Sequence, residues 1–316
     1  MGVVALPNIG LGEVVGGSVL RWLPVPETPP AWKVSDEELE DVEILWPSRM
    51  GWEPGWCWVS PLYYSLRRRV RVREVDLPQS GEAGPLGLCV LIRGRAHDVG
   101  VSYSDNKDTD FDEPGRFDLL FKMQFRNEGY DEPWIVPGGY VADSLWIHGK
   151  VPTLRKVRDR QDFEHQVYGR FGMRFGADVR GRALEILTRQ NRFGFTGGGK
   201  LINYREFLGE VARAGICIDL PGKGPFCFRL VNYLGVGACT IAFPHAARLP
   251  VPLEDGVHIA YARPDMSNLV ELCEHYLSHP DEREKMRLAA QQYYDSYLHP
   301  ANLTSYYLRT MLDRLS

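Results

Sequence analysis

The sequence lacks the cysteine spacings that mark a metal site or a redox pair. Its six cysteines include no C-x-x-C pair, and none has a histidine neighbour at the spacing of a zinc ligand set. Cys217 and Cys239 lie inside apolar runs, where a reduced thiol behaves as a small hydrophobic side chain. This pattern excludes a zinc ribbon or a disulfide framework and predicts a cytoplasmic chain with reduced thiols.

Long apolar runs and an excess of one charge are also lacking. No stretch approaches the roughly 20 apolar residues of a membrane-spanning helix. The first residues, which include Pro7 and several glycines, do not resemble a signal peptide. The 37 basic and 41 acidic residues leave a net charge of −4, which gives no general attraction to nucleic acid but leaves a local basic groove open.

The length of 316 residues predicts two domains, and the first half carries several strand patterns. A leader rich in glycine and proline (1–33) is expected to be an extended or loosely packed arm. A helix is expected to begin at Ser60-Pro61. Strands are expected at 42–46, 70–77, 88–94, 98–104, 117–125 and 134–141. We expect residues 1–150 to form an N-terminal Rossmann-like domain.

The second half alternates strands and helices more regularly. Strands are expected at 165–173, 193–198, 216–220, 238–244 and 258–262, with helices at 180–190, 204–214, 226–237 and 267–278. This alternation predicts a parallel sheet with helices on both faces. We expect a second Rossmann-like domain over 151–280, facing the first, and C-terminal helices over 281–316 that pack back across the junction.

The segment 216–244 contains a strand, a Gly-Lys-Gly-Pro loop, a helix and a second strand. A helix that starts after a glycine loop at the carboxyl end of a parallel strand can hold a phosphate, because its free N–H groups point at the ligand. Lys223 adds a positive charge to this loop beside Gly224. The alternative is that the glycines serve only the backbone geometry of the turn.

This segment and the one after it resemble a known family. The run GICIDLPGKGPFCFRLVNYLGVGACTIAFP, followed by LEDGVHIAYARPDMSNLVELCEHYLSHPDEREKM, is similar to the C-terminal domain of group-one and spore-maturation-type glycosyltransferases. YGRF (168–171) resembles the Gly-Arg motif after the first strand of that domain, so the likeness covers about 120 residues. The matching positions are Arg229, Gly237-Ala238, Asp255-Gly256, Asp265, Leu269, Pro280, Arg283 and Met286.

The resemblance implies a fold, an activity and a donor site. It implies two facing Rossmann-like domains (the GT-B type), a nucleoside-diphosphate sugar as donor, and neither a cofactor nor a metal. Arg229 and Asn232 would lie on the donor helix. The family usually has a glutamate at the position of Asn232, and its carboxylate holds the ribose hydroxyls. An amide can still form hydrogen bonds there, but the change puts donor identity and activity in doubt.

Sugar transfer expels a diphosphate, so cations placed at the leaving group stabilise the transition state more than the ground state. Arg170 and Arg174 follow the first strand of the second half, and Lys223 lies in the glycine loop. Arg170 is the strongest candidate for the diphosphate, because a guanidinium can bind two oxygens at once. For Arg174 a surface ion pair is the alternative.

On the acceptor side, Asp105 follows a strand and is the candidate base for the acceptor hydroxyl, with His148 and Glu128 as the next candidates. Trp52 and Trp56, in a glycine-containing loop, offer aromatic faces for an acceptor, or they pack against the leader. The histidines stand alone in the sequence and are expected to be structural or exposed, although His245 follows a strand toward the predicted cleft.

Asp108-Thr109-Asp110 matches the Asp-x-Asp metal motif of the other major glycosyltransferase fold. The pattern of the second half favours the metal-free fold, so no metal is expected. The acceptor remains unknown. Two other functions stay open: a glycosyltransferase that acts on DNA or protein, and a non-catalytic protein that binds nucleotide sugars, for which Asn232 is the supporting residue.

Overall fold

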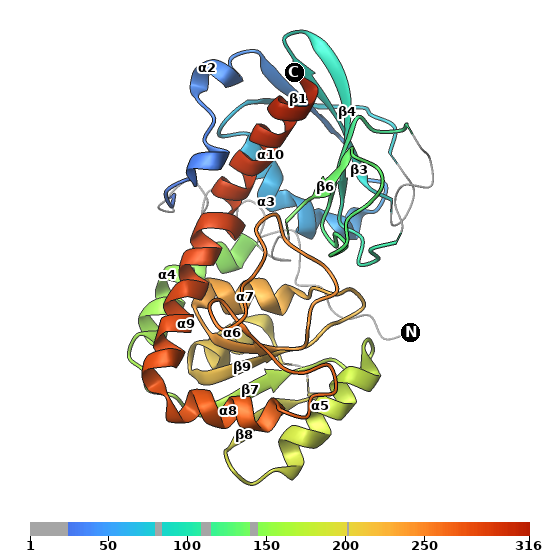
Figure 1. The fold of residues 1–316 in the computed structure, drawn as a ribbon. Coiled ribbons are helices and arrows are strands. Elements are labelled where there is room, and N and C mark those ends of the chain that lie inside the picture. Colours follow the sequence, from blue (N-terminus) through green and yellow to red (C-terminus); the bar gives the residue numbers. More distant parts are fainter. Residues whose placement is uncertain (1–24, 80–83, 109–114, 140–144, 201) are drawn as a thin grey trace.

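The computed structural model describes residues 25–79, 84–108, 115–139, 145–200 and 202–316. Within these ranges the protein is an α/β structure with two sheets, of six and five strands, flanked by helices (Figure 1). Both sheets are consistent with Rossmann-like domains. None of the described helices is both long enough and apolar enough to cross a membrane.

The six-stranded sheet belongs to the first half of the chain and has the order β2-β1-β3-β4-β5-β6. All strands run in one direction except β3, which is antiparallel to both β1 and β4. The carboxyl ends of the other five strands therefore lie on one edge of the sheet. The strands are β1 (Val42–Pro47), β2 (Arg71–Val75), β3 (Leu86–Ile92), β4 (Arg95–Ser102), β5 (Leu119–Lys122) and β6 (Ile135–Pro137).

One helix of the first half begins earlier than predicted. The short helix α2 (Asp36–Leu39) begins with a capping box of Ser35 and Glu38. Helix α3 (Trp56–Leu66) begins at Trp56 and not at Ser60, because the 3₁₀ turn η2 (Glu53–Gly55) runs directly into it and leaves Pro61 inside the helix. The apolar residues of α3 pack on the core below the sheet, which offsets the lost backbone hydrogen bond.

The five-stranded sheet is wholly parallel, which confirms the prediction for residues 165–262. Its order is β11-β10-β9-β7-β8. The central strand β9 is buried along its whole length, as expected for a strand covered on both faces. The strands are β7 (His165–Arg170), β8 (Phe195–Gly198), β9 (Ala214–Asp219), β10 (Cys239–Ala242) and β11 (Ala260–Tyr261).

Helices cover both faces of this sheet. Helices α6 (Tyr204–Ala212) and α7 (Phe228–Val236) pack on one face, with α4 (Leu145–Arg158) outside them. Helices α5 (Ala177–Arg189) and α8 (Leu269–Ser278) pack together on the other. The chain order reverses between β7 and β9, which is the switch point where open α/β sheets bind ligands.

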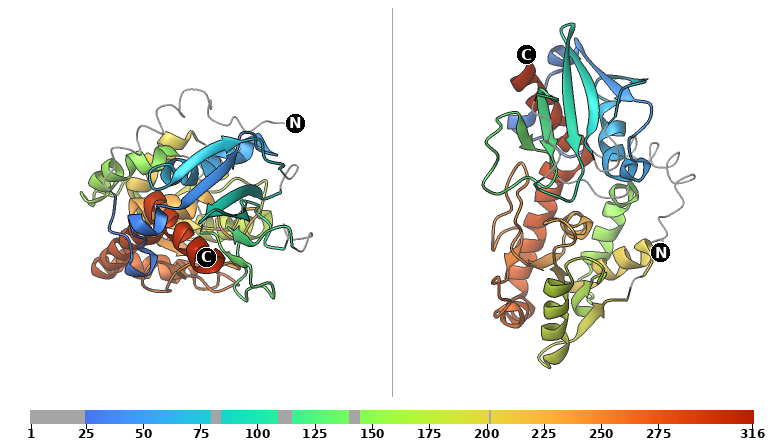
Figure 2. Two further views of the ribbon diagram at one scale, coloured as in Figure 1. Left: turned by 90° about the horizontal axis from the view of Figure 1, so that it is seen from above. Right: turned by 90° about the vertical axis from the view of Figure 1, so that its right-hand side faces the viewer.

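The C-terminal helices contact both parts of the molecule. Helix α9 (Pro280–Tyr293) packs on α7 and β10, and the π-helical segment η3 (Tyr294–Leu298) links it to α10 (Pro300–Leu315). Helix α10 packs on α3 and β5, so the two helices pass from the five-stranded to the six-stranded sheet (Figures 1 and 2). The hydroxyls of Tyr306 and Tyr307 donate to the backbone oxygens of Pro137 and Gly138, at 2.6 and 2.7 Å.

The described end of the predicted leader also packs on α10. Trp32, in the 3₁₀ turn η1 (Pro30–Trp32), is buried, and its ring centroid lies 5.2 Å from that of Tyr297 and 5.0 Å from that of Tyr306. The amide of Asn302 donates to the backbone oxygen of Glu27. This part of the leader is thus a packed segment, held by contacts across almost the whole sequence.

Two glycines of the second half provide a matched test of the packing between β7 and β8. A Cβ atom at Gly197 would lie 1.9 Å from the backbone oxygen of Gly169 on the neighbouring strand, and Gly197 has a φ of +142°. We expect Gly197→Ala to lower the free energy of unfolding by about 2–4 kcal/mol. Gly181 lies within α5, where a Cβ atom meets only the end of Met173 at 3.8 Å. Gly181→Ala should raise it by about 0.5–1 kcal/mol. Urea unfolding of both variants checks this, and equal effects would contradict the close approach of β7 and β8.

Candidate functional site

Segments that follow strands of the two sheets meet at one junction. The Gln124 side chain, just beyond β5, donates to the backbone oxygen of Phe226 at 3.1 Å and accepts from its backbone N–H at 3.0 Å. The Asn127 amide donates to the backbone oxygen of His245 at 2.9 Å. Phe226 follows β9 and His245 follows β10. Segments that follow the carboxyl ends of strands in both sheets therefore meet here, and α/β proteins place their ligands beyond such strand ends.

Asp105 lies three residues beyond β4 and contacts the loop that follows β9. A Cβ atom at Gly224 would lie 2.6 Å from the Asp105 backbone oxygen. Lys223 is exposed, and its charge acts on the Asp105 carboxylate. Burial raises the pKa of Asp105 above its usual 3.8, while the charges of Lys223 and Lys122 oppose this rise. A carboxylate of the first half and the Lys-Gly loop of the second thus lie together.

A buried lysine supports this corner of the junction. Lys122, the last residue of β5, has no exposed surface. Its ammonium group donates to the Ser102 hydroxyl at 3.1 Å and to the backbone oxygen of Asn106 at 2.5 Å. These contacts compensate part of the cost of burying the charge and fix the segment that carries Asp105 beside β5.

A second polar cluster lies where β9, β10 and β11 end. Asp219, the last residue of β9, is 1% exposed, and its carboxylate lies 3.8 Å from Nε of Arg229 and 3.3 Å from Nε2 of His245. The other ring nitrogen of His245 lies 3.0 Å from the Tyr261 hydroxyl. Arg229 also donates to the backbone oxygen of Leu220 at 2.7 Å. The predicted donor residue Arg229 is therefore held by the protein itself, beside a carboxylate.

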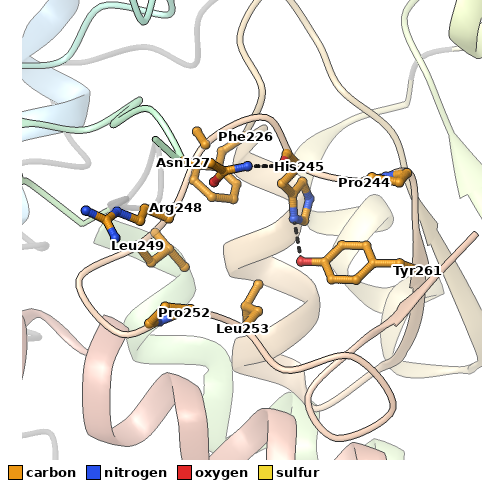
Figure 3. A pocket seen from close by; sticks show the side chains of 10 residues that line it. Asn127, Phe226, Pro244, His245, Arg248, Leu249, Pro252, Leu253 and Tyr261 are labelled. Atoms are coloured by element: carbon orange, nitrogen blue, oxygen red, sulfur yellow. Dashed lines mark hydrogen bonds between the residues drawn. The ribbon is translucent and has the colours of Figure 1, made fainter. Parts of the chain in front are cut away.

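A cavity of about 230 Å³ opens next to this cluster (Figure 3). The Phe226 ring lies against His245, with centroids 4.8 Å apart. The lining combines apolar side chains with four that carry polar groups, those of Asn127, His245, Arg248 and Tyr261. The lining residues are Asn127, Phe226, Pro244, His245, Ala247, Arg248, Leu249, Pro252, Leu253 and Tyr261.

Arg170, predicted to bind the diphosphate, ends β7 and forms a two-point ion pair inside the second half. Its Nε and Nη2 lie 2.7 and 2.8 Å from the carboxylate oxygens of Glu210, and both side chains are 14% exposed. Glu210 raises the pKa of Arg170 further. Arg174 is exposed, with its guanidinium 5.1 Å from the Phe175 ring centroid. Binding of a diphosphate by Arg170 stays a prediction, and it requires Arg170 to share or leave Glu210.

Asn232 is fully buried within α7. Its side-chain oxygen accepts from the Tyr204 hydroxyl at 2.9 Å, and its Nδ2 has no acceptor among the described residues. The amide therefore lies inside the protein in this structure. Its predicted contact with a ribose remains a prediction.

The acceptor-side candidates lie in different environments. Trp52 is half-buried and stacks on Tyr103, with centroids 6.2 Å apart, whereas Trp56 packs among the aromatic residues around Trp46. Glu128 is exposed, next to the cavity residue Asn127. His148 is buried in α4, and its Nδ1 lies 2.5 Å from the Tyr294 hydroxyl, so it belongs to the core.

The predicted Asp-x-Asp motif lies partly outside the described residues, since Asp110 is among those that the structure does not describe. Asp108 forms an ion pair with Arg126 at 2.8 Å. No group of three or more candidate metal ligands gathers within the described ranges.

Three contributors to the junction were not singled out from the sequence: Gln124, Asp219 and Arg180. Arg180 is buried and donates to the backbone oxygens of Gly172 and Pro221, which joins the loops after β7 and β9. A sequence signal exists only for Asp219, an acidic residue at the carboxyl end of an otherwise apolar strand. The other two are polar residues whose partners lie far away or in loops.

No protein-family model matches this chain, and no curated protein matches it in sequence.

The buried His148 predicts a loss of stability in acid. Burial, and secondarily the charge of His299, lowers the pKa of His148 from 6.5 to about 3. As the pH falls below 6.5, His148 binds a proton in the unfolded chain but not in the folded protein. The free energy of unfolding therefore falls by about 1.4 kcal/mol per pH unit for this group. His148→Asn should flatten the dependence by that amount between pH 6 and 4. Urea unfolding at several pH values measures it, and parallel profiles of variant and wild type would contradict the assignment.

Proposed function

We propose that this protein transfers a sugar from a nucleoside-diphosphate sugar to an acceptor hydroxyl, with its two sheets acting as the facing Rossmann-like domains of a GT-B-type glycosyltransferase. The observation that carries the proposal is the contact, at the junction, between segments that follow strand carboxyl ends of the two sheets. This places Asp105 of the first half against the Lys223-Gly224 loop of the second. The sequence resemblance of the second half supports the same activity.

The proposed mechanism separates two tasks between the two halves. Lys223 stabilises the negative charge that develops on the leaving diphosphate, because an exposed ammonium group at the head of a glycine loop can reach its oxygens. Asp105 accepts the proton of the acceptor hydroxyl as that oxygen attacks the sugar. Burial raises the pKa of Asp105, which makes it a better proton acceptor than an exposed aspartate, while the charges of Lys223 and Lys122 favour its ionised form.

A second candidate function is nucleotide-sugar binding without turnover. It is favoured by the identity of Asn232, an amide at the position where the resembling family usually has a glutamate. A protein of this kind would bind donors and hydrolyse none of them.

Lys223 allows a direct test of donor binding. Titration calorimetry with nucleoside diphosphates of each common base should show binding by the wild type. Lys223→Ala should weaken it by about 1–3 kcal/mol, through loss of a charge-assisted contact. Lys156→Ala removes an exposed lysine on α4 and serves as the control. Equal affinities of the two variants would remove Lys223 from the site, and no binding by the wild type would end the proposal.

Asp105 separates the enzyme from the binder. Donor hydrolysis without acceptor, and transfer to simple hydroxyl acceptors, should be measured in excess chelator with a panel of nucleotide sugars. Asp105→Asn keeps the shape of the side chain and removes its basicity, so turnover should fall by roughly 10²–10⁴-fold with donor affinity nearly unchanged.

Two outcomes would count against this assignment. Near-normal turnover of the Asn variant would exclude Asp105 as the base and direct attention to Glu128. Tight donor binding by a wild type that turns over no donor would instead favour the non-catalytic function.

A further inference from the structure

Asp219, His245 and Tyr261 form a hydrogen-bonded chain from the protein interior to the cavity wall. Each follows or ends a different strand of the five-stranded sheet, so their side chains meet at its carboxyl edge. The Asp219 carboxylate lies 3.3 Å from Nε2 of His245, whose Nδ1 lies 3.0 Å from the Tyr261 hydroxyl. The side chains of Asp219 and His245 are 1% and 4% exposed, and His245 and Tyr261 both line the cavity (Figure 3).

The chain fixes which way the Tyr261 hydroxyl points its proton. The oxygens of the Asp219 carboxylate, which lies beside the guanidinium of Arg229, accept hydrogen bonds, and Nε2 of His245 is the donor placed against them. In the neutral imidazole, Nδ1 then carries no proton, so it accepts a hydrogen bond from the Tyr261 hydroxyl. Burial raises the pKa of Tyr261, so the hydroxyl keeps its proton for this bond. The Tyr261 oxygen is left with lone pairs alone to offer to the cavity.

A cavity with this wall suits a ring that carries hydroxyl groups. Its volume of about 230 Å³ has room for a single ring and not for a whole nucleotide sugar. Phe226 and Leu253 provide apolar surface for a ring face, and Asn127 and Arg248 provide polar groups on its lining. The Tyr261 oxygen, as an acceptor, can pair with a ligand O–H.

We propose that Tyr261 is a specificity-determining residue that accepts a hydrogen bond from one ring hydroxyl of the nucleotide sugar, with Asp219 and His245 as its positioning residues. This inference rests on the proposed function, since it assumes that a nucleotide sugar is the ligand. The hydroxyl belongs either to the transferred sugar or to the ribose, which have the same chemistry. A ligand that lacks it leaves the lone pairs of the Tyr261 oxygen without a partner from the ligand, and sites built to bind a hydroxyl reject deoxy analogues.

The experiment measures dissociation constants for two sets of ligands. One set is a nucleoside-diphosphate glucose, with the base that binds best, and its 2-, 3-, 4- and 6-deoxy forms. The other set is the parent nucleoside diphosphate and its 2′- and 3′-deoxy forms. The wild type should bind one analogue of one set roughly 10- to 100-fold more weakly than its parent. The set that contains this analogue identifies the ring.

Tyr261→Phe should abolish that discrimination, so that parent and analogue bind within about twofold of each other. His245→Phe should reduce it, because the Tyr261 proton is then free to turn toward the cavity. Tyr276→Phe removes the hydroxyl of a buried tyrosine on α8 that does not line the cavity, and its discrimination should match the wild type.

The wild-type measurements keep the inference testable if a variant fails to fold. Equal binding of every deoxy analogue by the wild type overturns it while leaving the proposed function intact. The same holds if folded Tyr261→Phe, with an unchanged circular dichroism spectrum, discriminates as the wild type does. If no nucleotide sugar binds the wild type, both proposals are overturned.

Discussion

The pairing of the Gln124 amide with the backbone of Phe226 fixes the part of the junction on which the candidate site depends. One side chain satisfies both the N–H and the C=O of a buried residue in the other half, as a neighbouring strand would. Gln124 follows β5 and Phe226 follows β9, so the bond fixes the edges where both sheets end. Asp105, Lys223 and the cavity all lie at this junction.

The secondary structure of the second half was predicted well because its signals are local. Its strands are short apolar runs between glycine loops and amphipathic helices, and each pattern is complete within about ten residues. Helix α4 was not predicted, because Gly149 and Pro152 weaken its helical signal and packing on α6 and α7 supplies its stability. The reversed direction of β3 was also missed, since a strand's direction follows from pairing and not from its own composition.

The candidate site was predictable only where a residue's position follows from the strand before it. Asp105 and Lys223 were both placed beyond strand ends, and the structure brings them together. The partners of Arg170 and Asp219 were not predictable, because Glu210 lies 40 residues and His245 lies 26 residues further along the chain. Such contacts depend on how helices and loops pack around the sheet, which no local pattern encodes.

The distribution of the positive charges explains why the junction matters for any anionic ligand. Arg170, Arg180 and Arg229 each donate to carboxylate or backbone oxygens of the protein, which holds the loops after β7 and β9 in shape. These guanidinium groups are therefore engaged mainly in contacts within the protein, because a buried guanidinium must be hydrogen-bonded where it lies. Lys223 and Arg248, by contrast, are exposed and lie where the second half contacts the first. Attraction for the proposed diphosphate would therefore depend less on the five-stranded sheet alone than on how the six-stranded sheet is held against it.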